Sequence, residues 1–382
     1  MSEQAVLIAG YSGRALAASA RRAGFLPLVA DAFADTDTLA IAHSHEHLPR
    51  SLSRGFRLRS LIAALDRLSA KAPSPPIGLA LAAGFEDDPE LVAALESRYR
   101  LIGCGAEAVR AAKDPDRLFS IAAELGIAFP ETSRTPPADA TGWLTKRIGG
   151  SGGTHIARCK TRVSGTADRY LQREIAGEPL SMLGVVGRGA AFAFTSPWVD
   201  PAPRRPYRFG GLYGGIDVEA DLEARLVGIG VDLARTLGLK GLVSVDFVIA
   251  DGNPLLVDVN PRPGASLDVL DDENGTLFAA HLAALRGEDP TAILARDWRP
   301  HPRGLAYFYA DQGPLTVPAM DWPAWVTDRP PAAAAIANHD PVVTVHAEAG
   351  DQQVAKALLT ERLGQVHTMM YGHAKKTKET PR

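Results

Sequence analysis

Cysteine is scarce in this chain of 382 residues, which contains only Cys104 and Cys159. Two cysteines cannot build a disulfide framework or a thiolate zinc cluster, so we expect reduced thiols in a cytoplasmic protein. Long apolar runs are also missing, and no uninterrupted stretch is long enough to span a membrane. The N-terminus has no positive segment, and its apolar run at 5–9 is too short for the core of a signal peptide.

Excess charge of either sign is missing as well. Lys and Arg number 41 against 44 Asp and Glu, which gives a formal net charge of −3. Nucleic-acid binding requires clustered basic residues, and no basic run precedes the tail segment 375–378. We therefore expect neither a nucleic-acid partner nor a membrane partner. An apolar content of 46% and a charged content of 22% are typical of a folded globular protein, and the length allows two or three domains.

Two apolar runs flank the turn at 251–254, and each carries one acid in a place that should be apolar. A hairpin closed at this turn puts Asp246 nearly opposite Asp258. Asn260 points to the same face as Asp258, because it lies two residues further along. Two carboxylates and an amide oxygen on one sheet face suit Mg²⁺, which in such sheets usually arrives with the phosphates of a nucleotide. The alternative is an edge hairpin whose acids face water, which the apolar neighbours disfavour.

A glycine-rich segment follows a short predicted strand at 143–148. Its members are Gly149, Gly150, Ser151, Gly152 and Gly153. Such a segment leaves backbone N–H groups bare and able to fold over a polyphosphate. Lys146, near the end of the strand, can reach phosphate oxygens as a point charge. The pattern is not a P-loop, because the lysine precedes the glycines, and a flexible surface hairpin is the alternative if the loop is taken alone.

In combination, these features resemble an ATP-grasp enzyme. In that family a strand lysine, a glycine-rich flap, a hinge segment and an acid/Asn-x-Arg metal segment occur in this order. The hinge here resembles residues 170–181. The resemblance implies that Gln172, Arg173 and Ile175 lie on the adenine side and that Glu178 holds the ribose hydroxyls. Some relatives carry this acid one place later, where the present chain has Pro179.

By the same resemblance, the magnesium ligands are Asp246, Asp258 and Asn260, with Mn²⁺ as a substitute ion. Many relatives have Glu where Asp258 stands. Arg262 would face the transferred phosphoryl group, or it is a loop arginine bonded to nearby carbonyls. An earlier family lysine corresponds to either Lys113 or Arg117, or to neither; Lys113 is our choice. The predicted nucleotide is ATP, and the predicted catalytic residues are Lys146 and Arg262.

The segment 197–215 reads as a long irregular loop rich in arginine and aromatic residues. Long loops without regular structure are either functional or disordered. Arg204, Arg205, Tyr207 and Arg208 would suit a substrate that bears a carboxylate and an aromatic group. A mobile lid without chemical importance is the equally weighted alternative.

The N-terminal pattern predicts a strand at 5–9, a helix at 15–23 and a strand at 25–30, which is a β-α-β start. His43, His45 and His47 alternate as on a strand, but no second ligand cluster follows, so we expect no zinc site there. The overall fold class is α/β and α+β. From the resemblance we expect a Rossmann-like leading domain at 1–110, a two-lobed ATP-grasp domain at 111–300, a small β-rich C-terminal domain at 301–371 and a flexible tail at 372–382.

The closest subgroup comprises carboxylate–amine ligases related to biotin carboxylase, whose members share a C-terminal stretch like Asp328-Arg329-Pro330 followed by 340–345. The resemblance implies an ATP-dependent ligase that forms an acyl phosphate, releases ADP and phosphate, and joins a small carboxylate to an amine. It also implies a homodimer and a place in one-carbon cofactor biosynthesis. The alternatives are a bicarbonate-using carboxylase and a nucleotide-binding module that does not catalyse.

Overall fold

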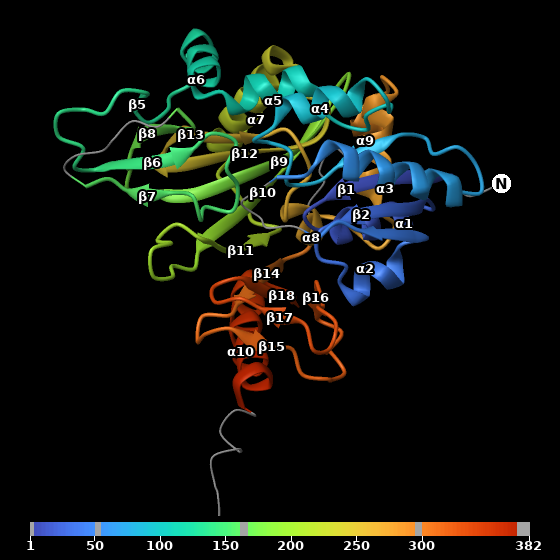
Figure 1. The fold of residues 1–382 in the computed structure, drawn as a ribbon. Coiled ribbons are helices and arrows are strands. Elements are labelled where there is room, and N and C mark those ends of the chain that lie inside the picture. Colours follow the sequence, from blue (N-terminus) through green and yellow to red (C-terminus); the bar gives the residue numbers. More distant parts are fainter. Residues whose placement is uncertain (1–3, 50–54, 161–166, 295–299, 373–382) are drawn as a thin grey trace, which may run out of the picture.

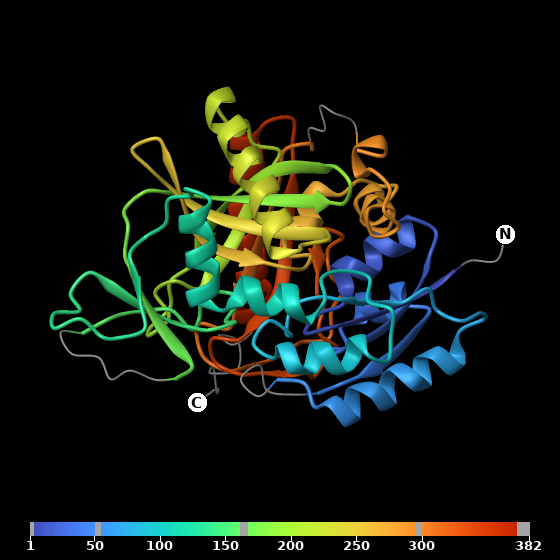
Figure 2. The ribbon, with the colours of Figure 1, turned by 90° about the horizontal axis from the view of Figure 1, so that it is seen from above.

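The computed structural model describes residues 4–49, 55–160, 167–294 and 300–372. Residues 373–382 of the predicted flexible tail lie outside the described residues, as does the basic run at 375–378. Figure 1 shows three regions: a parallel sheet near the N-terminus, a small sheet on the opposite side, and a large sheet between them that continues into the C-terminal part. Figure 2 shows the same separation from above.

The leading region is a four-stranded parallel sheet in the order β3-β2-β1-β4. Its two central strands are completely buried and, apart from Asp31 at the end of β2, apolar, as expected for a parallel sheet covered on both faces. The strands are β1 (Ala5–Gly10), β2 (Leu26–Asp31), β3 (Ser44–His47) and β4 (Leu79–Leu81), and the helices are α1 (Arg14–Arg22), α2 (Thr36–Ile41), α3 (Leu58–Lys71) and α4 (Pro89–Glu96). The predicted β-α-β start is therefore confirmed, and the carboxyl ends of β1 and β2 lie side by side.

Two helices and a small antiparallel sheet follow. Helix α5 (Ala106–Lys113) ends directly before Asp114, whose side chain caps α6 (Pro115–Glu124). The small sheet has the order β5-β8-β6-β7. Its strands are β5 (Thr132–Ser133), β6 (Trp143–Arg147), β7 (Ala157–Arg158) and β8 (Arg169–Arg173).

The central feature is an eight-stranded sheet in the order β13-β12-β9-β10-β11-β14-β18-β16. Its strands are β9 (Glu178–Val186), β10 (Ala190–Val199), β11 (Phe209–Gly214), β12 (Gly241–Ala250), β13 (Asn253–Asn260), β14 (Arg303–Tyr309), β16 (Val326–Thr327) and β18 (Pro341–Glu348). Strands β15 (Leu315–Thr316) and β17 (Ala335–Ile336) form a separate pair. The other helices are α7 (Ala220–Leu237), α8 (Ser266–Leu270), α9 (Thr276–Leu285), the short 3₁₀ helix η1 (Pro290–Ala292) and α10 (Gln352–Tyr371).

The predicted fold class is confirmed, but some element boundaries were wrong. The segment 197–215 is not one long loop, because β10 continues to Val199 and β11 begins at Phe209. Trp198 stacks on Tyr213 across these two strands, and this contact extends the sheet. The large sheet also continues past residue 300, because β14 pairs with β11. The C-terminal part is therefore an extension of this sheet, covered by α10 (Figure 1).

Within the described ranges, every helix is too short or too polar to cross a bilayer.

Candidate functional site

The hairpin of β12 and β13 has the predicted geometry. Asp246 pairs with Asp258 across the two strands, and a register shift follows directly after Asp246. Asn260 lies opposite Ser244. The turn is made by Asp251 and Gly252, both with positive φ, as in the tight turns that match the twist of a hairpin. The two acids and the amide are thus held on adjacent strands of one sheet.

Asp246 is fixed by neighbouring side chains. The hydroxyl of Ser181 on β9 donates to one of its carboxylate oxygens, and Asn260 Nδ2 donates to the other at 3.0 Å. Burial raises the pKa of the Asp246 carboxyl above its ordinary value, and the nearby Asp258 carboxylate raises it further. An added cation would therefore be favourable at this position.

Lys113 supplies one such cation at the end of α5. Its ammonium donates to both Asp258 oxygens, at 2.9 and 3.0 Å, and to Asn260 Oδ1 at 2.9 Å. The lysine is 6% exposed. Arg117, the other candidate for this position, instead bonds to Glu107 at 2.8 Å on the surface. Of the two residues, Lys113 is the one that contacts the acid hairpin.

The oxygen atoms that hold the Lys113 ammonium also fit a divalent ion. Asp258 provides a carboxylate and Asn260 an amide oxygen, which are hard ligands of the kind that Mg²⁺ prefers. The Ser244 hydroxyl, opposite Asn260, is buried and has no hydrogen-bond partner among the described residues. The donor set therefore fits Mg²⁺.

Lys146 on β6 is a second buried lysine. Its ammonium donates to Gln172 Oε1 at 3.2 Å and to the Val257 carbonyl at 3.3 Å. Burial opposes its charge, but the Tyr170 hydroxyl and the Asp258 and Asp246 carboxylates raise the pKa of Lys146 overall. The side chain therefore remains charged and joins the small sheet to β13.

The glycine-rich flap at 149–153 lies against two other regions. A side chain at Gly149 would meet Asp87 and the Glu86 carbonyl of the leading region, at 2.4 and 2.5 Å. The Gly152 carbonyl accepts a hydrogen bond from the N–H of Phe209 at 2.9 Å. Gly150 lies under the His155 ring, and the half-buried Ser151 lies between these glycines. The close approaches at Gly149 and Gly150 explain why glycine is needed at these two positions.

The predicted hinge residues lie where β8 passes into β9. Gln172 is buried, and its Nε2 has no hydrogen-bond partner in the part of the chain that the structure describes, so this donor is available to a ligand. Arg173 donates to the Thr141 carbonyl at 3.0 Å and stacks over Trp143. Ile175 is half-buried in the connection, whereas Glu178 is exposed at the start of β9. The adenine and ribose roles of these residues stay predictions.

Arg262 contacts a residue that the sequence analysis missed. Its Nε donates to Glu86 Oε1 at 2.6 Å, and Glu86 Oε2 accepts the N–H groups of Gly84 and Phe85 at 2.6 and 2.9 Å. Burial disfavours the Glu86 charge, but Arg262, Lys113 and the Gly84 N–H lower the pKa of Glu86 to about 2. Glu86 gave no signal in the sequence, because it lies on a loop of the leading region 176 residues from Arg262.

A cavity of about 250 Å³ opens beside Lys113 and Glu86. It is bounded by Asp87 of the leading region, Asp114 between α5 and α6, and Ile148 next to the flap. The predicted nucleotide lysine, the residue before the flap and the leading region therefore border one cavity.

The four predicted substrate residues have separate positions. Arg208 is fully buried, bonds to Asp311 and Asp200, and lies 3.6 Å from the centre of the Tyr309 ring. Arg205 donates to the His339 carbonyl at 2.9 Å. Tyr207 donates to Glu174, and Arg204 is exposed with positive φ. The guanidinium of Arg208 is engaged inside the protein, so direct substrate contact by this group would require rearrangement.

Comparison with known proteins finds a family match over part of the chain. A family model described as the ATP-grasp domain matches residues 112–266. A D-alanine–D-alanine ligase from Lactiplantibacillus plantarum is 40% identical over 50 residues, which are 13% of this chain and only 14% of that protein.

Two solved structures share the fold over nearly the whole chain. L-amino acid ligase from Bacillus licheniformis has a TM-score of 0.70 at 14% identity and covers 95% of this chain and 97% of its own. Biotin carboxylase from Campylobacter jejuni, solved as a beta-gamma-ATP complex, has a TM-score of 0.68 at 13% identity and covers 93% of this chain and 89% of its own. The chain therefore contains a segment, 112–266, that matches the ATP-grasp domain, and it shares the overall fold of these two structures.

Proposed function

We propose that the protein is an ADP-forming ligase that uses ATP to join a carboxylate to an amine through an acyl phosphate. The observation that carries this proposal is the meeting of Lys113, Asp258 and Asn260 within 3.0 Å. A buried lysine on one acid of the hairpin, with a second buried lysine and a glycine flap in the same region, suits a triphosphate and its metal ion.

In this proposal, Lys146 and the flap at 149–153 hold the ATP phosphates and exclude water. Lys113 leaves Asp258 for a phosphate oxygen, and Asp246, Asp258 and Asn260 hold Mg²⁺. The bound ion supplies charge neutralisation as the phosphoryl group moves. Gln172, Arg173 and Ile175 border the adenine, and Glu178 faces the ribose.

The chemistry then proceeds in two displacements. A substrate carboxylate oxygen attacks the γ-phosphorus, the bond to the β-phosphate oxygen breaks, and ADP leaves. The amine nitrogen attacks the acyl carbon, phosphate leaves, and the nitrogen loses a proton. Arg262, oriented by Glu86, stabilises the charge of the transferred phosphoryl group. Neither step requires a nucleophile from the protein.

Other properties are proposed from the resemblance alone. They are small-molecule carboxylate and amine substrates, a cytoplasmic location, a homodimer, and an acceptor that belongs to one-carbon cofactor biosynthesis. Arg204, Arg205, Tyr207 and Arg208 remain candidates for the wall of the substrate site.

The test is a screen of small carboxylates with MgATP and hydroxylamine, which converts an acyl phosphate into a hydroxamate without knowledge of the natural amine. We expect ADP and hydroxamate in equal amounts with at least one carboxylate, and none with Asp258→Ala. ADP formation that requires bicarbonate and gives no hydroxamate would instead indicate the carboxylase. MgATP binding without ADP formation under any condition of the screen would indicate a module that does not catalyse.

A further inference from the structure

His155 follows the glycine-rich flap and bonds back to the strand that enters it. Strands β6 and β7 pair through Leu144–Arg158 and Thr145–Ala157. One step further along β6, the backbone N–H of Arg147 donates to Nδ1 of His155 at 3.0 Å. The imidazole thus continues the pairing with a side chain in place of a backbone carbonyl, and it closes the base of the flap.

The ring of His155 also packs directly against the flap. A carbon atom added to Gly150 would lie 2.5 Å from Cδ2 and 2.6 Å from Cγ of the ring. The three ring atoms nearest to this position are Cδ2, Cγ and Nδ1, so Nε2 lies further out. The His155 carbonyl accepts a hydrogen bond from Arg169 of β8 at 3.2 Å. Both the side chain and the backbone of His155 are therefore held in place.

The hydrogen bond to Nδ1 determines where the ring proton of His155 lies. A backbone N–H can only donate, so Nδ1 carries no proton. Burial, and next the Lys146 ammonium, lower the pKa of His155 to about 4, so the ring is neutral near pH 7. Its single proton is then on Nε2, which becomes a hydrogen-bond donor. In the part of the chain that the structure describes, no group accepts a bond from this nitrogen.

Charged groups of the proposed nucleotide site surround the His155 ring. The ammonium groups of Lys146 and Lys113 oppose its protonation, whereas the Asp258 carboxylate favours it. These three groups belong to β6, α5 and β13, the elements that the proposed function places around the phosphates. Ile148, directly after β6, borders the cavity that Lys113 also lines. The ring therefore lies beside the space proposed for the phosphates.

A role limited to the structure of the flap would use only one of the two ring nitrogens. The bond from Arg147 to Nδ1 is sufficient to close the base of the flap. The Nε2–H group is left over as a neutral donor next to glycines that present backbone N–H groups. Such a donor forms a charge-assisted bond to a phosphate oxygen without adding a further cation beside Lys113 and Lys146.

We propose that His155 is a further nucleotide-binding residue, whose Nε2–H donates to a phosphate oxygen of the bound nucleotide. The inference rests on the proposed function only for the presence of a nucleotide in this space. Because Nδ1 is bonded to the backbone of β6, the same ring joins the phosphate to the base of the flap. A bound phosphate would in this way hold the flap closed.

The test compares two variants of His155 by isothermal titration of the full chain with MgADP. In His155→Asn the amide oxygen can replace Nδ1 as acceptor, but the side chain ends short of the Nε2 position. In His155→Gln the amide reaches the Nε2 position. We expect His155→Asn to bind MgADP at least tenfold more weakly than the wild type, and His155→Gln to lose less affinity.

His47→Asn is the control, because His47 is exposed on β3 and bonds only to the Ala32 carbonyl among the described residues. This variant should bind MgADP as the wild type does. The proposal is overturned if His155→Asn also binds like the wild type. It is equally overturned if His155→Gln loses as much affinity as His155→Asn or more, because the structure of the flap would then explain the losses.

Histidine ¹⁵N NMR adds a readout that a purely structural role would not move. The wild type should show a ring that is protonated on Nε2 and is missing from the His155→Asn spectrum. Its Nε2 signal should shift on saturation with MgADP, and an unchanged signal would contradict the proposal.

These measurements separate the phosphate contact of His155 from the ligase function. A wild type that binds no MgADP would refute both. A wild type that binds MgADP, with an equally tight His155→Asn variant, would refute only the role of His155. Weaker binding by His155→Asn, together with no ADP formation in the carboxylate screen, would refute the ligase function and retain the phosphate contact.

Discussion

The ammonium of Lys113 lies within 3.0 Å of both carboxylate oxygens of Asp258, although the two residues are 145 positions apart in the chain. This pair joins the end of α5 to β13. In the absence of a nucleotide, the single ammonium of Lys113 balances the charge of Asp258. The N–H donors of this ammonium match phosphate oxygens equally well. The exchange of this lysine between carboxylate and phosphate is how we expect nucleotide binding to free the metal ligands.

Lys146→Met should abolish ADP formation, with a loss of at least about 100-fold, because the variant retains the apolar stem but not the charge that holds the phosphates. The loss of the bonds to Gln172 and Val257 should cost about 1–2 kcal/mol of stability. Coupled assays of ADP release and thermal unfolding check both expectations. A variant with normal ADP release would remove Lys146 from the nucleotide site.

Gly153→Ala should weaken ATP binding about tenfold or more, because the added methyl group would lie 1.8 Å from the Tyr207 carbonyl oxygen and force the flap away. Gly152→Ala is the matched control. Its φ of +69° resembles the +72° of Gly153, but no atom lies within 4 Å of the added carbon. Nucleotide titration of both variants separates the steric contact from the backbone strain that they share. Equal effects would show that the contact with Tyr207 is unimportant for ATP.

Glu86→Gln should lower kcat for ADP formation while the Kd for MgATP changes little, because Glu86 orients Arg262 and does not itself hold the nucleotide. The loss of a buried charge partner should also cost on the order of 2–3 kcal/mol of unfolding free energy. Glu90→Gln, which removes the exposed acid bonded to Arg110, is the control. Steady-state kinetics and direct MgATP titration distinguish these outcomes. A parallel loss of MgATP affinity would assign Glu86 to the nucleotide site.

Asp35→Asn should become more stable than the wild type as the pH rises from 5 to 8. The pKa of Asp35 is raised to about 8 in the folded protein, so the folded state binds more protons than the unfolded state between the two pKa values. Stability is therefore lost as the pH rises through this window, by an amount on the order of a few kcal/mol. Arg14, Asp31, Asp37 and Asp328 face this group and remain in the variant. Denaturant unfolding at pH 5 and pH 8 measures the difference, and parallel pH profiles would contradict it.

The acid hairpin was predictable because its information is local. The alternation of residue types along each strand, the turn and two acids at positions expected to be apolar fix the register of β12 against β13. This register places Asp246 opposite Asp258. The strand with Lys146 and the flap were predictable for the same reason. The contact of Lys113 with Asp258 could not be predicted, because the choice between Lys113 and Arg117 depends on how α5 packs on β13.

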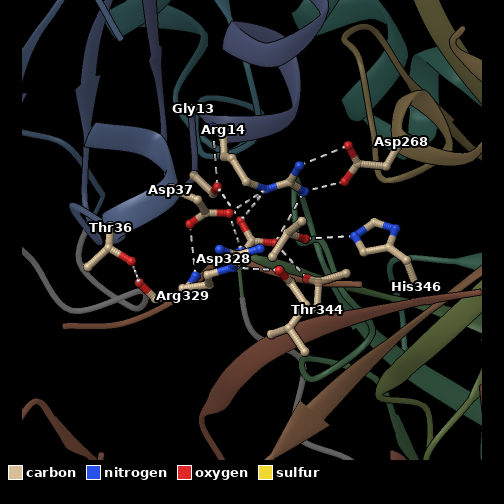
Figure 3. Close-up of polar contacts among 12 residues, drawn as sticks. Gly13, Arg14, Thr36, Asp37, Asp268, Asp328, Arg329, Thr344 and His346 are labelled. Carbon is tan, nitrogen blue, oxygen red and sulfur yellow. Dashed lines mark hydrogen bonds and ion pairs between the residues drawn. The ribbon is translucent and has the colours of Figure 1, made fainter. Parts of the chain in front are cut away.

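Long-range contacts account for what the sequence analysis missed. Glu86 meets Arg262 only because the leading region folds onto the hairpin, and a loop acid has no pattern that reveals this. The segment 197–215 reads as loop because of its prolines and glycines, but the stacking of Trp198 on Tyr213 and the pairing of β11 with β14 recruit its ends into the sheet. The contact between Arg14 and Asp328 also depends on the packing of segments that are far apart in the chain (Figure 3).

The most direct test of the account is a crystal structure with Mn²⁺ and a non-hydrolysable ATP analogue, in which anomalous scattering locates the metal ion. We expect Mn²⁺ about 2.0–2.4 Å from oxygens of Asp258 and Asn260, with Lys113 turned to the phosphates. An ion bound elsewhere, or an intact Lys113–Asp258 contact beneath a bound nucleotide, would contradict the central claim that this hairpin carries the metal of the reaction.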